Sequence, residues 1–419
     1  MITTTRERTA DAVRAYGHKP TVFAAFLHFD LSFMIWVLLG ALGVSISETL
    51  GLSAAEKGLM VAIPILSGSL MRIPLGLLSD RYGGRRVGLG MLLALFIPLI
   101  VGWRSGTTLD VLVVVGLLLG VAGASFAVVL PLASRWYPPE RQGLVMGIAA
   151  AGNSGTVIAN LVAPRVAAVV GWQNVLGLTM IPLVLVLVTF WFLAKDSPTR
   201  VTQQSLGSYL AALRERELWW FCLFYSVTFG GYVGLSSFMP LLLRDQYQLP
   251  AVTAGYLTAL AALAGSALRP VGGWVADKVG GVRLLSVLLG GIAATYLAAS
   301  RLPALTPMIA ILVVSMVCLG LGNGAVFQLV PQCFRRQIGI ATGVVGAIGG
   351  LGGFMLPTML GQFKQHTGSF GSGFTVLGAM ALLTLVLLRW LMARSESWRS
   401  SWRRAPVTDM PARRKAAAA

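Results

Sequence analysis

Two stretches of this sequence repeat each other, Arg72-Ile-Pro-Leu-Gly76-Leu-Leu-Ser-Asp80-Arg81-Tyr-Gly83-Gly84-Arg85-Arg86 and Arg269-Pro-Val-Gly-Gly273-Trp-Val-Ala-Asp277-Lys278-Val-Gly280-Gly281-Val-Arg283. An arginine, a glycine, an aspartate, a basic residue and a glycine pair recur at one offset of 197 residues, since 269 − 72 = 277 − 80 = 197. Each stretch begins inside an apolar run and ends in a short polar segment. The pattern predicts two parallel structural repeats, related by an axis along the membrane normal.

The composition places the chain among membrane proteins. Of its 419 residues, 56% are hydrophobic and only 11% are charged, with a mean hydropathy of +0.77. A soluble domain carries about a quarter charged residues, so this chain has too little polar surface to cover a water-soluble globule. The net charge of +18 is high enough to suit nucleic acid. The basic residues lie in short segments between apolar runs, however, so we expect no nucleic-acid partner.

Twelve apolar runs are long enough to cross a bilayer, which takes about 20 residues. They span residues 22–46, 57–78, 86–104, 110–134, 142–166, 172–194, 218–243, 252–276, 283–301, 306–331, 338–362 and 373–393. The predicted fold is therefore all-α, with two six-helix bundles. The predicted parts are an N-terminal tail (1–20), a first bundle (21–194), a linker (195–217), a second bundle (218–393) and a disordered basic tail that meets anionic lipid (394–419).

The distribution of basic residues predicts the orientation. With both termini in the cytoplasm, 25 of the 33 lysines and arginines lie on the inner side and 6 on the outer side. The remaining 2, Arg72 and Arg269, lie inside helices. Because lysine and arginine are enriched in cytoplasmic loops, the bias predicts a multi-pass protein of the cytoplasmic membrane, facing this way.

Arg72 and Arg269 are predicted to lie near the middle of the bilayer. Each precedes its loop aspartate by eight positions, about 12 Å along a helix, in a hydrocarbon layer about 30 Å thick. A charge at this depth costs several kcal/mol unless it faces a cavity and meets a partner. The acids closest to this depth are predicted to lie nearer to helix ends; they are Asp30, Glu48, Glu56 and Asp110. The missing partner is then an anionic cargo, held by two guanidinium groups that each donate parallel hydrogen bonds. The alternative is that each arginine bonds backbone carbonyls or extends its side chain to water.

The segment Gly76 to Arg86 closely resembles the loop signature of the major facilitator superfamily, and the second copy is a looser match. The resemblance covers the membrane part of the chain. It implies two six-helix bundles around a central cavity that rock to give alternating access. It also implies that the loop residues act as conformational latches at the inner face. These residues are Asp80, Arg81, Arg85, Arg86, Asp277 and Lys278.

Two glycine-rich helices extend the resemblance to the nitrate/nitrite porter family of this superfamily. Their glycines are predicted to let helices pack closely; they are Gly147, Gly152, Gly155, Gly346, Gly349, Gly350, Gly352 and Gly353. The segments Tyr225-Ser-Val-Thr-Phe229-Gly and Gly322-Asn323-Gly324-Ala-Val-Phe327-Gln328 also match. The resemblance implies a nitrate- or nitrite-binding site formed by Arg72, Arg269, Asn153, Tyr225, Phe126 and Phe229. Aromatic rings suit a flat, weakly hydrated anion, and an amide and a hydroxyl can donate to it without adding charge.

Two coupling schemes remain open at this point. In anion exchange, two repelling cations resist closure of the empty cavity, and nitrate or nitrite neutralises part of their charge. In proton-coupled uptake, His28 and Asp30, predicted one to two turns into the first helix, carry protons. Other readings are an anion sensor that does not transport, and an organic-anion or drug porter of the same fold.

Enzyme chemistry has no support in the sequence. The three histidines are scattered, none of the six lysines follows a glycine, and the three cysteines have no metal-ligand spacing. We expect no cofactor, no metal site and a monomer in membrane lipid.

Overall fold

The structure is a computed structural model that describes residues 17–137, 145, 149, 151–198, 207, 211–334 and 338–401. Within these ranges, ten helices are long and apolar enough to cross a bilayer. The first and fifth predicted spans are the two that are not among these ten. The first is divided into α2 (Lys19–Trp36), α3 (Leu38–Ala41) and α4 (Gly43–Leu50), and the fifth contains a 3₁₀ turn, η1 (Ala151–Ser154), before α11 (Gly155–Val170). The prediction of an all-α membrane fold is confirmed, and ten of the twelve predicted spans are candidate membrane helices among the described residues.

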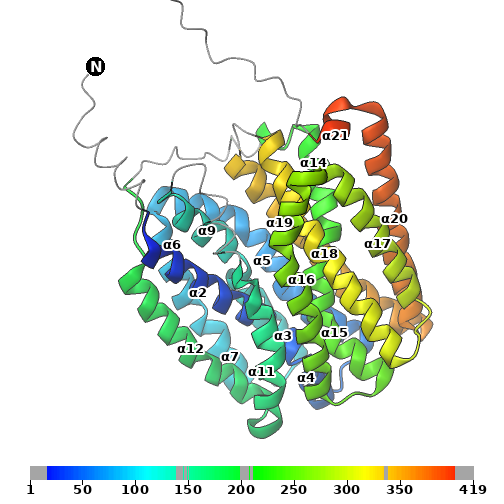
Figure 1. The fold of residues 1–419 in the computed structure, drawn as a ribbon. Helices are drawn as coiled ribbons and strands as arrows, with labels where there is room; N and C mark the ends of the chain where they lie inside the picture. The colour runs from blue at the N-terminus through cyan, green and yellow to red at the C-terminus, as the bar shows by residue number, and fades with distance from the viewer. Residues whose placement is uncertain are drawn as a thin grey trace, which may run out of the picture.

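The other helices follow in sequence order. In the first half they are α5 (Ala54–Tyr82), α6 (Gly84–Ala94), α7 (Phe96–Ser105), α8 (Leu109–Gly123), α9 (Ser125–Ser134) and α12 (Trp172–Leu193). In the second half they are α14 (Arg216–Tyr225), a π-helical turn η2 (Ser226–Gly230), α15 (Gly231–Tyr247), α16 (Ala251–Val279), α17 (Gly281–Ala299), α18 (Leu305–Cys333), α19 (Ile338–Thr367), α20 (Phe370–Arg394) and α21 (Glu396–Ser400). The helices up to α12 lie mainly on the left of Figure 1, and those from α14 onward mainly on the right.

The sequence repeat sets the same turn in both halves. Gly83 joins α5 to α6 with φ 93°, and Gly280 joins α16 to α17 with φ 99°. These two glycines are 197 residues apart, which is the offset of the repeat. Because residues with a Cβ rarely adopt such positive φ values, glycine is required where each long helix turns back at the end that carries Asp80 or Asp277. We call this the Asp80 end of the molecule, and the opposite one the Lys57 end.

The two halves meet along α5 and α19, and along α11 and α16. Near the Lys57 end the backbones touch: a Cβ on Gly58 would lie 2.5 Å from the Pro357 carbonyl oxygen, and one on Gly255 would lie 2.5 Å from that of Asn160. The same end carries two ion pairs between the halves, Lys57–Asp245 at 2.8 Å and Arg244–Glu48 at 2.8 Å. These contacts hold the two halves together at the Lys57 end.

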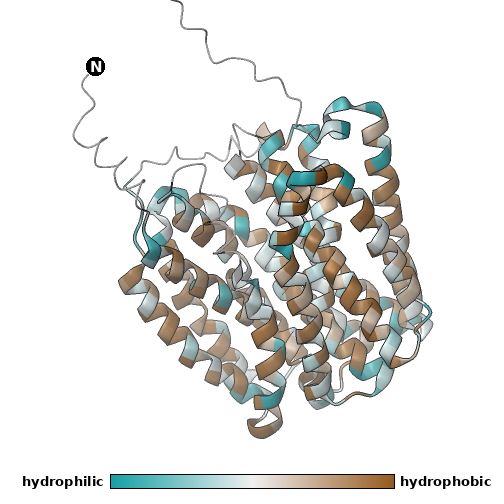
Figure 2. Ribbon diagram, in the orientation of Figure 1, coloured by the Kyte–Doolittle hydropathy of each residue, from teal (hydrophilic) through white to brown (hydrophobic). Residues whose placement is uncertain are grey.

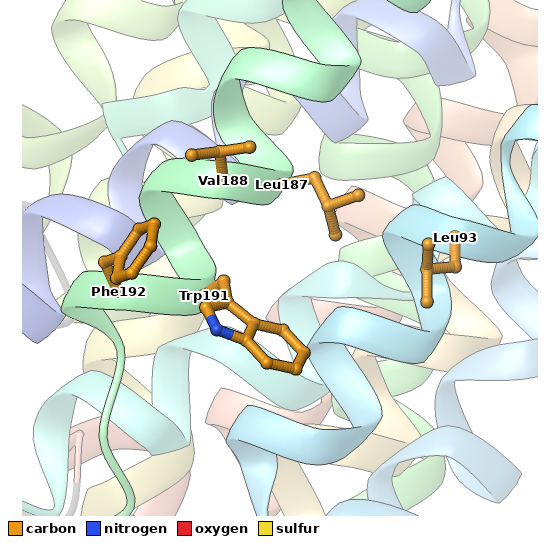
Figure 3. Close-up of a pocket in the computed structure, with 5 residues that line it drawn as sticks. All are labelled: Leu93, Leu187, Val188, Trp191 and Phe192. Carbon is orange, nitrogen blue, oxygen red and sulfur yellow. The ribbon is translucent and has the colours of Figure 1, made fainter.

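The outer surface of the helices is apolar, as a lipid-facing surface must be. Brown residues cover the flanks of the helices in Figure 2, and teal residues gather toward their ends. A groove of about 270 Å³ lies on this surface between α6 and α12 (Figure 3). Five hydrophobic or aromatic side chains line it: Leu93, Leu187, Val188, Trp191 and Phe192.

Two features differ from the sequence-based expectation. The first helix begins at Lys19, because His18 caps it and Pro20 occupies its first turn. Asp30 therefore lies eleven residues into α2, about three turns, and the prediction that it lies nearer to a helix end is wrong. In the predicted disordered tail, Glu396–Ser400 form α21 because the Trp398 ring packs on those of Phe221 and Phe224, at 5.2 and 5.8 Å. Residues 402–419 lie outside the described ranges.

Candidate functional site

The candidate site is built around Arg72 of α5, which is only 2% exposed. Its Nε donates to the Gly123 carbonyl at 3.2 Å, and its Nη1 donates to the Gly346 carbonyl of the other half. Its Nη2 has no hydrogen-bond partner among the described residues. A buried guanidinium with an unpaired donor carries a desolvation cost, which an acceptor at Nη2 would offset.

A local change in the fourth span presents the Gly123 carbonyl. The span divides at Ala124 into α8 and α9, and the Ala127 N–H bonds to the Ala124 carbonyl, three residues back. Such a tightened turn departs from the regular i→i+4 ladder. Gly123 thus offers its oxygen to Arg72, and Phe126 lies two residues after the break. The Arg72 Cζ lies 5.6 Å from the centre of the Phe126 ring.

Arg269 is the counterpart of Arg72 on α16 and is half-buried. Its Nη2 donates to the Tyr225 hydroxyl at 3.4 Å, and its Cζ lies 5.7 Å from the Phe327 ring centre. Its Nη1 is buried and has no hydrogen-bond partner in the described part of the chain. Each of the two arginines therefore retains one N–H group that no described residue accepts.

Aromatic rings connect the two arginines along two routes. On the first, the Arg72 Cζ lies 5.0 Å from the centre of the Phe229 ring. That ring stacks on the Tyr225 ring, with centres 4.9 Å apart and an interplanar angle of 1°, and the Tyr225 hydroxyl accepts the hydrogen bond from Arg269. On the second, Phe126 contacts Phe327 with ring centres 5.8 Å apart, and the two rings face Arg72 and Arg269 respectively. Cation–π contacts favour such an arrangement, and the rings narrow the space around the guanidinium groups.

Irregular turns position several of these residues. Tyr225 ends α14 and Phe229 lies in the π turn η2, a kind of helix distortion that is frequent at functional sites. The glycines of α19 allow this turn to approach: a Cβ on Gly349 would lie 2.2 Å from the Tyr225 ring, and one on Gly352 would lie 2.3 Å from the Ser226 carbonyl oxygen. Bulkier residues at these positions would displace the aromatic wall of the site.

The remaining glycines also lie at helix contacts. A Cβ on Gly350 would lie 2.2 Å from the Ser69 Oγ of α5, and one on Gly353 would lie 3.0 Å from the Ile65 Cγ2. Gly346 supplies a carbonyl to Arg72. Gly152 and Gly155 lie against the backbone of Asp30. Gly147 falls outside the described residues.

Asn153 lies at the edge of the described site rather than in contact with it. It is 3% exposed and is carried by η1, which packs against α2 and α16. Its Oδ1 has no hydrogen-bond partner among the residues described. The structure thus brings five of the six predicted binding residues into one contact network and places Asn153 on a turn beside α16, the helix of Arg269.

Neither arginine forms an ion pair with any described residue. His28 is buried elsewhere, with its ring nitrogens 3.1 Å from the Gly88 carbonyl and 3.3 Å from the Ser32 hydroxyl. Asp30 accepts a hydrogen bond from Ser154 at 2.5 Å. The two residues considered for proton transfer therefore have partners within the first half of the chain.

The predicted latch residues make contacts within their own halves. Asp80 pairs with Arg135 at 2.5 Å, Arg85 donates to the Trp191 carbonyl at 2.7 Å, and Asp277 accepts from Gln328 at 2.8 Å. The other latch residues stack or stand exposed: Arg81 lies over Tyr82, Lys278 lies over Trp274, and Arg86 is exposed. Among the described residues, the two ion pairs between the halves thus lie at the Lys57 end, and the contacts named here at the Asp80 end join residues of one half.

Comparison with known proteins identifies the family. Residues 23–357 match the Major Facilitator Superfamily. The nitrite extrusion protein of Bacillus subtilis is 37% identical over 361 residues, which is 86% of this chain and 91% of that protein. The chain belongs to the nitrate/nitrite porter family of the major facilitator superfamily. It is therefore a multi-pass membrane transporter and not an enzyme.

Further members of the nitrate/nitrite porter family are similar over most of their length. The "probable nitrate/nitrite antiporter NarK1" of Thermus thermophilus is 33% identical, with 86% of this chain and 88% of that protein covered. The "probable nitrate transporter NarT" of Staphylococcus carnosus is 31% identical, with 87% and 94% covered. Among solved structures, a bacterial homolog of the human lysosomal transporter Spinster, in an inward-facing and occupied conformation, has the same fold. Its TM-score is 0.64 at 20% identity, with 88% of this chain and 94% of that chain covered.

Sequence reasoning missed three parts of the site. Trp36 lies under Arg72, with its ring centre 5.6 Å from the Cζ, and two carbonyl oxygens hold the same guanidinium. Phe327 belongs to a segment that resembles the family, but it was not predicted to line the site. A glycine carbonyl carries no side-chain signal. Phe327, by contrast, lies four residues after the polar Asn323 and so on the same face of the helix, a spacing that could have identified Phe327 as a site residue.

Proposed function

We propose that this transporter carries nitrate and nitrite across the cytoplasmic membrane, with the anion held between Arg72 and Arg269. The observation that carries the proposal is a pair of guanidinium nitrogens, Arg72 Nη2 and Arg269 Nη1, whose N–H groups no described residue accepts, in a network of aromatic rings. An oxyanion can accept from both guanidinium groups and offset their uncompensated charge. The names of the relatives, a nitrite extrusion protein and a nitrate/nitrite antiporter among them, support the same cargo.

The shape of the anion fits the walls around the arginines. Nitrate is flat, and the parallel Tyr225 and Phe229 rings offer flat apolar faces, as does the Phe126 ring, whose centre lies 5.6 Å from the Arg72 Cζ. The Tyr225 hydroxyl, which accepts from Arg269, can turn its own hydrogen toward an anion. We assign Asn153 the role of a further neutral donor, through the amide on η1. This arrangement favours a small planar oxyanion over a large organic acid.

The contacts between the halves support alternating access. We propose that the protein is closed at the Lys57 end, which faces outward, and open toward the Asp80 end, which faces the cytoplasm. The two ion pairs Lys57–Asp245 and Arg244–Glu48 close the outer end. Both ends of the described chain lie at the Asp80 end. Near the first end, His18 stacks on Trp136, which follows α9. At the other end, the Ser401 hydroxyl accepts from the Val282 N–H at the start of α17. The positive-inside bias supports our assignment of that end to the cytoplasm.

We propose anion exchange as the coupling mode. Two cations in a low-dielectric site repel each other, so the empty site resists occlusion, and a bound anion lowers this cost. The return of the carrier then requires an anion in each direction. His28 is an unfavourable proton carrier, because both of its ring nitrogens have partners away from the arginines.

Flux into proteoliposomes tests the cargo and the coupling together. We expect nitrate uptake into vesicles loaded with nitrite to exceed uptake into vesicles without a permeant anion by at least about tenfold, because exchange avoids the return of an empty site. Vesicles without protein serve as the background. Equal rates in loaded and empty vesicles would refute obligate exchange, and stimulation of empty vesicles by a proton gradient would favour symport. No nitrate flux in any condition would refute the cargo.

A further inference from the structure

Asp30 of α2 lies where the first and fifth spans make their closest contact. A Cβ on Gly155 would lie 1.9 Å from the Asp30 carbonyl oxygen, and one on Gly152 would lie 2.7 Å from the Asp30 backbone nitrogen. Glycine at both positions lets the two backbones touch. The Asp30 side chain is thereby brought to the junction between η1 and α11.

The Asp30 carboxylate performs a capping role for a helix other than its own. Ser154, the N-cap residue of α11, makes no side-chain cap bond to its own helix and donates to Asp30 Oδ1 at 2.5 Å. Gly155, the first residue of α11, lies directly against the Asp30 backbone. The N-terminal amides of a helix need acceptors and favour a negative charge. Asp30 supplies both to the point at which α11 begins.

This junction lies directly beside Asn153. Asn153 directly precedes Ser154 in η1, a four-residue 3₁₀ turn whose own hydrogen bonds are weaker than those of an α-helix. Its neighbours must therefore fix its orientation. Phe29, next to Asp30, adds a second contact: its Cδ1 would lie 2.9 Å from a Cβ on Gly152, and its ring centre lies 6.0 Å from that of Phe126. One turn of α2 thus contacts both the Asn153 turn and a wall of the arginine site.

We infer that Asp30 is a positioning residue, whose carboxylate holds the η1 turn so that Asn153 faces the transported anion. The inference rests on the proposed function, because it takes Asn153 as a donor to that anion. It assigns Asp30 a role through Asn153 instead of the transfer of protons. Loss of the carboxylate is then expected to weaken anion affinity in every transport mode, while the maximal rate changes little.

A double-mutant cycle on nitrate exchange tests the inference. We expect Asp30→Ala and Asn153→Ala each to raise the KM for nitrate by about tenfold, the range for one hydrogen bond to a charged group. The double variant should have the KM of Asn153→Ala alone, because both changes remove the same contact, that of Asn153 with the anion. Asp30→Asn, which can still accept from Ser154, should retain more of the affinity, and Ser154→Ala should lose part of it. Asp110→Asn, an exposed acid in the first turn of α8, is the matched control and should not change KM.

Three results would overturn the inference: an unchanged KM in Asp30→Ala, an additive double variant, or an unchanged KM in Asn153→Ala. Loss of proton-driven uptake in Asp30→Asn with unchanged exchange would identify a proton carrier instead.

A readout without transport separates the inference from the proposed function. In a protein with Cys222, Cys318 and Cys333 replaced by alanine, we expect a cysteine introduced by Asn153→Cys to react with a thiol reagent several-fold faster when Asp30→Ala is added. Asp110→Asn should leave that rate unchanged. An equal rate with and without Asp30→Ala would refute the positioning role, even if nitrate proves to be the cargo. Faster labelling in a protein that moves no nitrate would refute the proposed function alone.

Discussion

Replacement of Arg72 by lysine is expected to reduce nitrate uptake by at least about tenfold, and Arg269→Lys is expected to cause a smaller loss. Lysine keeps the charge but loses the planar fork that donates to an oxyanion along two parallel directions. Hydrogen bonds to charged groups contribute roughly 1.5–3 kcal/mol, which corresponds to about a tenfold to hundredfold change in affinity. Arg72 should be the more sensitive because it is 2% exposed and also bonds carbonyls of both halves.

The measurement is initial nitrate uptake by proteoliposomes with equal amounts of inserted protein. Arg283→Lys, an exposed position in the first turn of α17, is the control and should retain wild-type uptake. Uptake within twofold of wild type in both Arg72→Lys and Arg269→Lys would contradict bidentate capture of the anion.

Reversal of one charge at the Lys57 end is expected to open that end. Asp245→Lys places a third cation beside Lys57 and Arg244, where the wild type has a 2.8 Å ion pair. Like charges brought together across an interface cost several kcal/mol. We expect the contacts between α3 and α15 to separate more often, and transport to fall because the protein returns to the inward-open state less often.

Labelling of a buried cysteine can measure this opening. Ser237→Cys introduces a thiol at a 1% exposed position whose backbone packs against Gly40. A membrane-impermeant thiol reagent applied from the Lys57 side should label it several-fold faster in Asp245→Lys. The double charge exchange Lys57→Asp with Asp245→Lys should restore the wild-type rate. Unchanged labelling in Asp245→Lys, or no restoration in the double exchange, would show that the ion pair does not close this end.

The parts of the fold and site that depend on side-chain type could be predicted from the sequence. The 197-residue repeat identified Arg72 and Arg269 as equivalent, and the lack of an acid near them pointed to an anion. The glycines of the fifth and eleventh spans predicted close helix contacts, and the structure describes such contacts at Gly155 and Gly349.

The parts that depend on backbone geometry could not be predicted. The break at Ala124 uses residues that also suit a regular apolar helix, so hydropathy does not reveal it. The carbonyl oxygens of Gly123 and Gly346 bind Arg72, but backbone acceptors have no sequence signature. The depth of Asp30 was misjudged because the cap at His18 lies in a polar segment, which a search for apolar runs excludes.

An experimental structure of the protein at saturating nitrate tests the central claim most directly. The account predicts density for one flat anion between the Arg72 and Arg269 guanidinium groups, within hydrogen-bond distance of Arg72 Nη2 and Arg269 Nη1 and against the Phe229 and Phe126 rings. Density for nitrate only elsewhere would contradict it, and so would a carboxylate of the protein that pairs with each arginine.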